Sequence, residues 1–235
     1  MPFGRVPLVL AMLLAGGIGP AHADPVRVPQ VPVLTPALQS HLAALDQAID
    51  VRTDQLAAQT APFHPRTGPY SAQFMLELVM DLPPGTTVGI YDPGAAAPAL
   101  CPVFTAPLST GGFALLDFRP APARVTVRMF DVDATLRESH TCPGLLPRTF
   151  AFYLQGPAGT FYMEDARNPG GAAQVLQFAA DGIWYDDRWL AFEDRPVGAG
   201  SDQGYDDVLF ALHCASCVPD PARRRSWGAL KGPYR

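Results

Sequence analysis

Residues 189–212 of this chain read WLAFEDRPVGAGSDQGYDDVLFAL. Two short apolar runs, at Trp189–Phe192 and Val208–Leu212, enclose a polar loop that contains three glycines. Apolar runs of this length, bounded by turn-forming residues, are typical of buried strands. The stretch therefore predicts two strands joined by a flexible polar loop, and it indicates a β-rich fold.

The loop between these two strands is acidic. Its five carboxylates repel one another unless solvent or a cation separates them, and a hard cation such as calcium prefers oxygen ligands of this kind. The alternative is a solvated turn whose aspartates cap backbone N–H groups. The sequence predicts a calcium site with a bidentate Glu193, monodentate Asp194, Asp202 and Asp207, and Asp206 as a fifth ligand.

Period-two alternation continues outward from this stretch. Phe74, Leu76, Leu78 and Met80 share one face of a strand, and 124–129 and 149–154 alternate in the same way. Turn residues such as Pro83-Pro84-Gly85 separate the segments. About nine short strands with frequent turns predict a mainly β fold, an antiparallel, jelly-roll-like β-sandwich over residues 70–217. The other predicted strands are 87–91, 112–118, 160–164 and 174–178.

The N-terminal part has a different character. Residues 1–23 have the basic start, apolar centre and Ala-x-Ala end of a signal peptide, which predicts export to the periplasm, cell surface or medium. No later run is long enough to predict a transmembrane segment in the mature chain. Residues 24–69 are predicted to contain an extended tether, an amphipathic helix over 36–58 with Thr35 as N-cap, and a linker over 60–69.

Charge and cysteine content narrow the function classes. The net charge of −5 argues against a nucleic-acid partner. Four cysteines in an exported chain predict two disulfides, and of the three possible pairings Cys101–Cys142 with Cys214–Cys217 is favoured. A redox role for Cys214 and Cys217 is the less favoured alternative. The Pro- and Arg-rich residues 218–235 predict a disordered basic tail.

A series of motifs resembles a known family. Phe150-Ala-Phe-Tyr-Leu, Gly159-Thr-Phe-Tyr, Asn168-Pro-Gly-Gly and the acidic loop itself, all within 148–212, are similar to the bacterial extracytoplasmic family catalogued as DUF 4114. Its members often occur in surface or exosortase-sorted proteins. The resemblance implies a β-sandwich and calcium binding. The chain departs from the family pattern at Gly204, where an acidic residue is usual, and at Asp206, where asparagine is usual.

These observations predict a structural or adhesive role at the cell surface or in the matrix, with a surface glycan or a matrix protein as partner. We find no recognisable catalytic motif. The alternative is a secreted glycan-binding or glycan-hydrolysing protein that uses Glu193 and a neighbouring aspartate. Two further acidic pairs, Glu164-Asp165 and Asp186-Asp187, are predicted to be exposed turn residues rather than ligands.

Overall fold

The computed structural model describes residues 26–57, 63–65, 68–79, 82–107, 109–146, 148–180, 188–198, 200–213 and 215–216, and for 68–79 and 215–216 it describes the backbone alone. The predicted signal peptide, the basic tail, Cys214, Cys217 and the acidic pair Asp186-Asp187 lie outside these residues.

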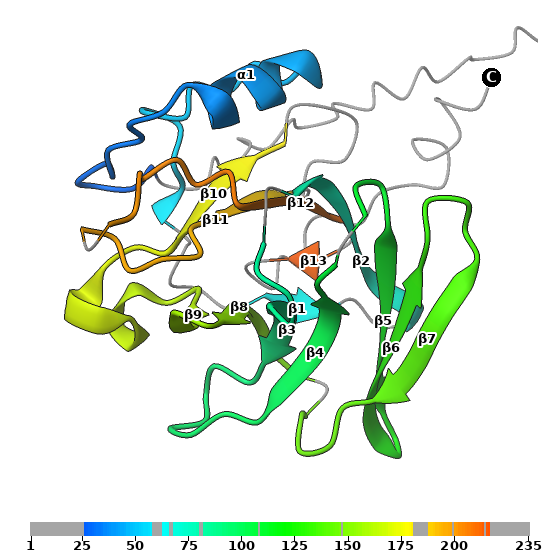
Figure 1. The fold of residues 1–235 in the computed structure, drawn as a ribbon. Helices are drawn as coiled ribbons and strands as arrows, with labels where there is room; N and C mark the ends of the chain where they lie inside the picture. Colours follow the sequence, from blue (N-terminus) through cyan, green and yellow to red (C-terminus); the bar gives the residue numbers. More distant parts are fainter. Residues whose placement is uncertain are drawn as a thin grey trace, which may run out of the picture.

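The fold is mainly β, and every strand pairing is antiparallel, as the sequence predicts. The larger sheet has seven strands, in the order β10 (Val175–Ala179), β11 (Arg188–Phe192), β12 (Val208–His213), β2 (Gly68–Val79), β5 (Phe113–Pro120), β6 (Ala123–Phe130) and β7 (Leu136–Thr141). The smaller sheet has four, in the order β4 (Leu100–Thr105), β3 (Thr87–Tyr91), β8 (Ala151–Gly156) and β9 (Gly159–Tyr162). A short pair, β1 (His64–Pro65) with β13 (Ala215–Ser216), lies beside them (Figure 1).

The first hydrophobic core lies between the two sheets. Phe152 on β8 packs edge-on against Phe210 on β12, with ring centroids 4.9 Å apart, and Phe210 stacks with Phe192 on β11. These rings are fully buried. Alternate residues of β5, β6, β11 and β12 face this core, which is the sandwich packing that period-two sequences produce.

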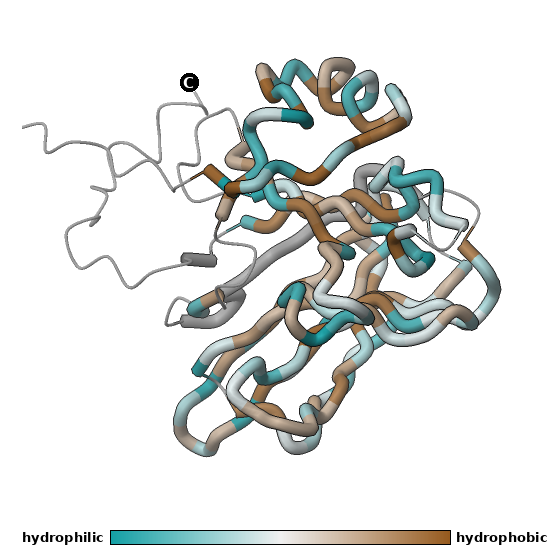
Figure 2. The backbone as a smooth tube through the Cα atoms, turned by 90° about the vertical axis from the view of Figure 1, so that its left-hand side faces the viewer, coloured by the Kyte–Doolittle hydropathy of each residue, from teal (hydrophilic) through white to brown (hydrophobic). Residues whose placement is uncertain are grey.

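A second core covers the other face of β10–β12. Leu176, Trp189 and Leu209 pack there against the N-terminal segment that carries α1 (Ala37–Ala44). Figures 1 and 2 both show this segment lying over that end of the sheet. Since both faces of β10–β12 are buried, these strands read as continuous apolar runs rather than as alternating ones, which accounts for the sequence WLAF and VLFAL.

The helix is much shorter than the sequence predicts. It ends at Ala44, and Asp46 follows with a φ of 56°, a left-handed conformation that stops the helix. Leu38 and Leu42 are buried side chains of the helix. Ile49 and Leu56 are also buried, but they belong to the irregular segment that follows the helix. The predicted helix over 36–58 is therefore wrong in its second half, because burial against the sheet, and not helical periodicity, selected those apolar residues.

Two strands that the sequence analysis did not predict, β4 and β7, form sheet edges. Pro102 interrupts the pattern of β4, and an edge strand tolerates it because its outer N–H groups need no partner. Most of β7 is exposed, so it lacks the apolar alternation that marks a strand. A disulfide joins Cys101 on β4 to Cys142 just after β7, with Cα atoms 5.4 Å apart, which is the predicted pairing. It links the smaller sheet to the edge of the larger one.

Candidate metal centre

The ends of β11 and β12 bring the acidic residues together. Phe192 pairs with Val208 in the antiparallel register, so Glu193 and Asp194 leave the sheet where Asp207 enters it. One carboxylate oxygen from each of these three residues lies within 4.8 Å of the others. Three of the five predicted ligands therefore converge, and the register of the two strands is the cause.

The backbone of this group is held by a buried glutamine. Gln174, just before β10, is fully buried. Its Nε2 donates to the carbonyl oxygens of Glu193 (3.2 Å) and Arg195 (2.7 Å), and its Oε1 accepts from the Val197 N–H at 2.8 Å. The sequence analysis missed this residue, because one polar position in a predicted strand gives no sign of what it binds.

The loop before β12 adopts a conformation that non-glycine residues rarely take. Gln203 and Tyr205 have φ values of 56° and 54°. Tyr205 is fully buried and its hydroxyl donates to the Ala173 carbonyl at 2.8 Å, while the Leu34 N–H donates to the Gln203 carbonyl at 3.1 Å. A left-handed residue costs on the order of 1 kcal/mol, and such residues cluster at functional sites. The burial of Tyr205 and these two hydrogen bonds hold the loop in this conformation.

Asp202 and Asp206 lie outside the three-carboxylate group and face Gly204. A Cβ at Gly204 would lie 2.5 Å from Asp206 Oδ1, 3.1 Å from Asp202 Oδ1 and 2.9 Å from Thr35 Oγ1. No side chain fits there without displacing one of these oxygens. Glycine at position 204 thus has a steric reason in this chain. Asp202 is exposed, whereas Asp206 is buried.

Burial and mutual repulsion disfavour the charged form of these acids. Burial raises the pKa of Glu193, and the charges of Asp202 and Asp194 raise it further, against hydrogen bonds from Ser201 and the Tyr205 N–H. Burial raises the pKa of Asp207 to about 7, although its Oδ2 accepts from the Asp194 N–H at 2.8 Å. Burial, with the charge of Asp202, also raises the pKa of Asp206.

Counter-charge for this group is sparse among the described residues. Arg195 Nε lies 3.7 Å from Asp194 Oδ1, with an arginine side chain that is 65% exposed. Glu193 is 1% exposed, and its Oε2 has no hydrogen-bond partner in the described part of the chain. Buried carboxylates are normally paired or bound to metal. This donor set, made only of oxygens, fits a hard cation such as calcium.

The other acidic pair that the sequence singled out is built differently. Arg167 Nε lies 3.2 Å from Glu164 Oε1, and an Arg27 N–H donates to Asp165. These acids are only partly exposed, and each has an arginine of its own. They contribute no ligand to the group around Glu193.

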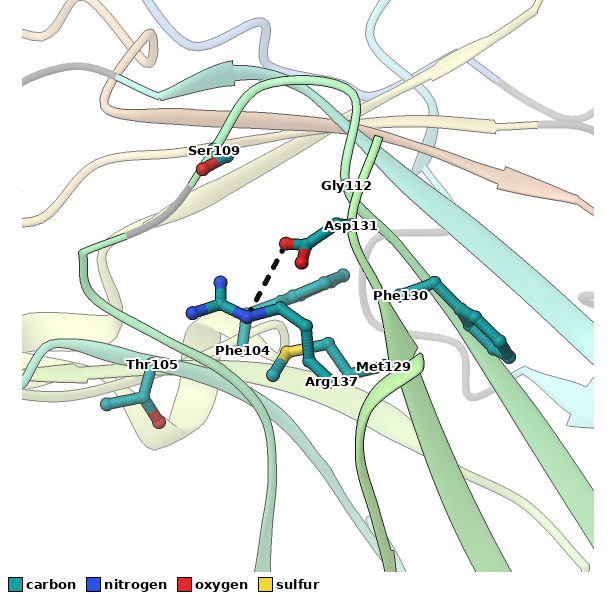
Figure 3. A pocket seen from close by; sticks show the side chains of 8 residues that line it. All are labelled: Phe104, Thr105, Ser109, Gly112, Met129, Phe130, Asp131 and Arg137. Atoms are coloured by element: carbon teal, nitrogen blue, oxygen red, sulfur yellow. Dashed lines mark ion pairs between the residues drawn. The ribbon is translucent and has the colours of Figure 1, made fainter. Parts of the chain in front are cut away.

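A third cluster, of Cys101, His140 and Cys142, has the spacing of a metal site, but both sulfurs form the disulfide. The hollow in Figure 3, between Phe104, Met129 and the Asp131–Arg137 ion pair, has a volume of about 20 Å³. That is room for about one water. Neither feature competes with the acidic group as a candidate site.

Comparison with known proteins supplies no further assignment: no family model, curated protein or solved structure matches the chain. The similarity to DUF 4114 therefore stays a prediction from the motifs. No helix in the described ranges is both long and apolar enough to cross a membrane.

Proposed function

We propose that this chain is an exported calcium-binding β-sandwich module with a structural or adhesive role at the cell surface or in the extracellular matrix. Glu193 carries the proposal. Its buried carboxylate, next to those of Asp194 and Asp207, has an oxygen without a hydrogen-bond partner in the described residues. The DUF 4114-like motifs and the signal-like N-terminus support the family, location and role.

Calcium would act on stability through the strands that carry its ligands. Glu193, Asp194 and Asp207 come from the facing ends of β11 and β12, so an ion held between them cross-links two central strands. It would also neutralise the repulsion that raises their pKa values. An adhesive module would then be stiff in a calcium-rich exterior and weaker in calcium-poor surroundings.

The hydrolytic alternative is less well supported by the same geometry. Glycoside hydrolysis requires an acid and a base on opposite sides of an accessible sugar bond. Here Glu193 is 1% exposed, and its carboxylate lies in a group with those of Asp194 and Asp207. Crowded, buried acids suit a cation better than a polysaccharide.

Isothermal titration calorimetry of the chain with calcium, and separately with magnesium, tests the proposal. We expect one calcium per chain, with protons released near neutral pH because the bound carboxylates must be ionised. Asp207→Asn should abolish binding, whereas Asp133→Asn, the same change in an exposed turn, should not. Equal binding by wild type and Asp207→Asn would place calcium elsewhere, and no calcium heat at all would refute the proposal.

A further inference from the structure

The loop that leads into β12 is held by a segment from the N-terminal part of the chain. Residues 27–35, which we call the strap, contain no helix or strand and lead into α1. They run beside the loop (Figure 1), and the Leu34 N–H donates to the Gln203 carbonyl at 3.1 Å. We propose that docking of the strap and binding of calcium at Glu193 strengthen each other. This inference rests on the proposed calcium binding.

A continuous chain of hydrogen bonds leads from the strap to the candidate ligand. The Gln203 carbonyl accepts from Leu34, and the Gln203 N–H donates to Ser201 Oγ at 2.9 Å. The Ser201 hydroxyl in turn donates to the Glu193 carboxylate. Gln203 has a φ of 56°, a conformation that persists only when its surroundings hold it. The bond from the strap therefore helps to place the hydroxyl that orients Glu193.

Apolar packing connects the strap to the same ligand by a second route. Val33 is 5% exposed and belongs to the same hydrophobic core as the fully buried Tyr205. The Tyr205 N–H donates to the Glu193 carboxylate. Lifting the strap would remove Val33 from this core and loosen the packing around Tyr205. Both donors to Glu193 thus depend on the docked strap.

The strap is also held by contacts that lie outside the acidic loop. Gln55 is fully buried, and its side chain accepts from the Val31 N–H at 2.8 Å and donates to the Val31 carbonyl at 2.7 Å. At the start of the strap, the Arg27 guanidinium donates to Asp165. These contacts allow the docking of the strap to be weakened while every residue of the acidic loop stays unchanged.

Coupling of this kind is reciprocal. If the docked strap raises the affinity for calcium by some factor, calcium must stabilise the docked strap by the same factor. Irregular segments of this kind open locally while the rest of a fold stays closed. In calcium-poor surroundings the strap should therefore leave the second core more often, and in calcium it should stay docked.

Gln55→Leu tests the coupling from the side of the strap. It removes the two hydrogen bonds to Val31, and a third to Val51, while keeping a buried side chain of similar size. The calcium affinity of the folded chain, measured by calorimetry, should fall about fivefold, at the low end of typical couplings. Gln39→Leu is the matched control. Gln39 bonds to the backbone of Ile49 and Val51, outside the strap, so its loss should leave the affinity unchanged.

Hydrogen exchange of the wild-type chain gives the reciprocal measurement. The Val31 and Leu34 amides, which donate to Gln55 and Gln203, should exchange about fivefold more slowly in calcium than in chelator. The slowing should level off once calcium saturates the site, as local opening of the strap requires. If Gln55→Leu does not fold, this measurement decides.

Four results would overturn the inference alone in a chain that binds calcium. They are an unchanged affinity in Gln55→Leu, an equal loss in Gln39→Leu, exchange at Val31 and Leu34 that ignores calcium, and slowing that grows without limit as calcium is added. The last would show that the strap opens only with the whole fold. A chain that binds no calcium would overturn the proposed function as well.

Discussion

Two acidic groups interact electrostatically with the buried Tyr205, one through Glu193 and one through Asp165. Both groups are at least partly buried, and within the described residues each contains carboxylate oxygens without a hydrogen-bond partner, at Glu193, Glu164 and Asp165. They differ in counter-charge. Glu164 and Asp165 each have a partly buried arginine. Among the described residues, the ion pair at the other group joins Asp194 alone to the exposed Arg195. The unpartnered oxygen is common to both groups, so the sparse counter-charge is what favours the proposed metal site at Glu193 over the pair at Glu164 and Asp165.

Removing an arginine from the paired group should have the largest effect. Arg167→Met loses the ion pair with Glu164 and two hydrogen bonds to the carbonyls of Pro93 and Ala95. Breaking a largely buried pair should lower the free energy of unfolding by about 3 kcal/mol, measured by urea denaturation. The loss should be the same with and without calcium, and Arg52→Met, on the surface, should change little. If calcium restored the lost stability, the paired acids would be a cation site too.

Neutralising Asp207, in the acidic group around Glu193, should raise the free energy of unfolding of the calcium-free chain rather than lower it. Asp207→Asn keeps the acceptor for the Asp194 N–H but removes a repelling charge. We expect the calcium-free chain to gain about 1 kcal/mol or more in free energy of unfolding and to lose its response to calcium, both measured by urea denaturation. A calcium-free chain destabilised by this change would show that the cluster is not strained by charge.

The stability of the calcium-free chain should fall as pH rises. The pKa of Asp207 is raised from its ordinary 3.8 to about 7, so between these values the folded chain holds a proton that the unfolded chain has lost. Folding stability is thus fullest at low pH and declines from about pH 4 through about pH 7. The calcium-dependent gain should grow over the same range. Denaturation at several pH values measures both trends, and Asp207→Asn should flatten them.

The smallest effect is expected at Asp202. It is exposed and lies outside the three-carboxylate group, although its charge raises the pKa of Glu193. Asp202→Asn should weaken calcium binding only a few-fold, in line with exposed charge interactions of up to about 1 kcal/mol. Calorimetry compares it with Asp207→Asn. Equal, complete loss in both variants would restore the larger ligand set that the sequence predicts.

The same comparison shows which features can be predicted from the sequence. Strands β11 and β12 and the acidic loop between them can be predicted, because strand burial and charge repulsion depend on residues close together in the chain. The arginine partners cannot, since Arg27 lies 138 residues from Asp165 in the chain. Gln174 was missed for the same reason: its role depends on segments brought together by the fold. The helix was overestimated because the apolar face of a sheet selects residues much as a helix stripe does.

The most direct test of the central claim is equilibrium unfolding of the chain in chelator, in magnesium and in millimolar calcium. Because an ion that binds only the folded chain stabilises it by mass action, calcium at about one hundred times its Kd should add about 2.7 kcal/mol. The account predicts this gain in calcium and little or none in magnesium. Identical unfolding curves in all three conditions would contradict it, and the acids around Glu193 would then be a strained but metal-free turn.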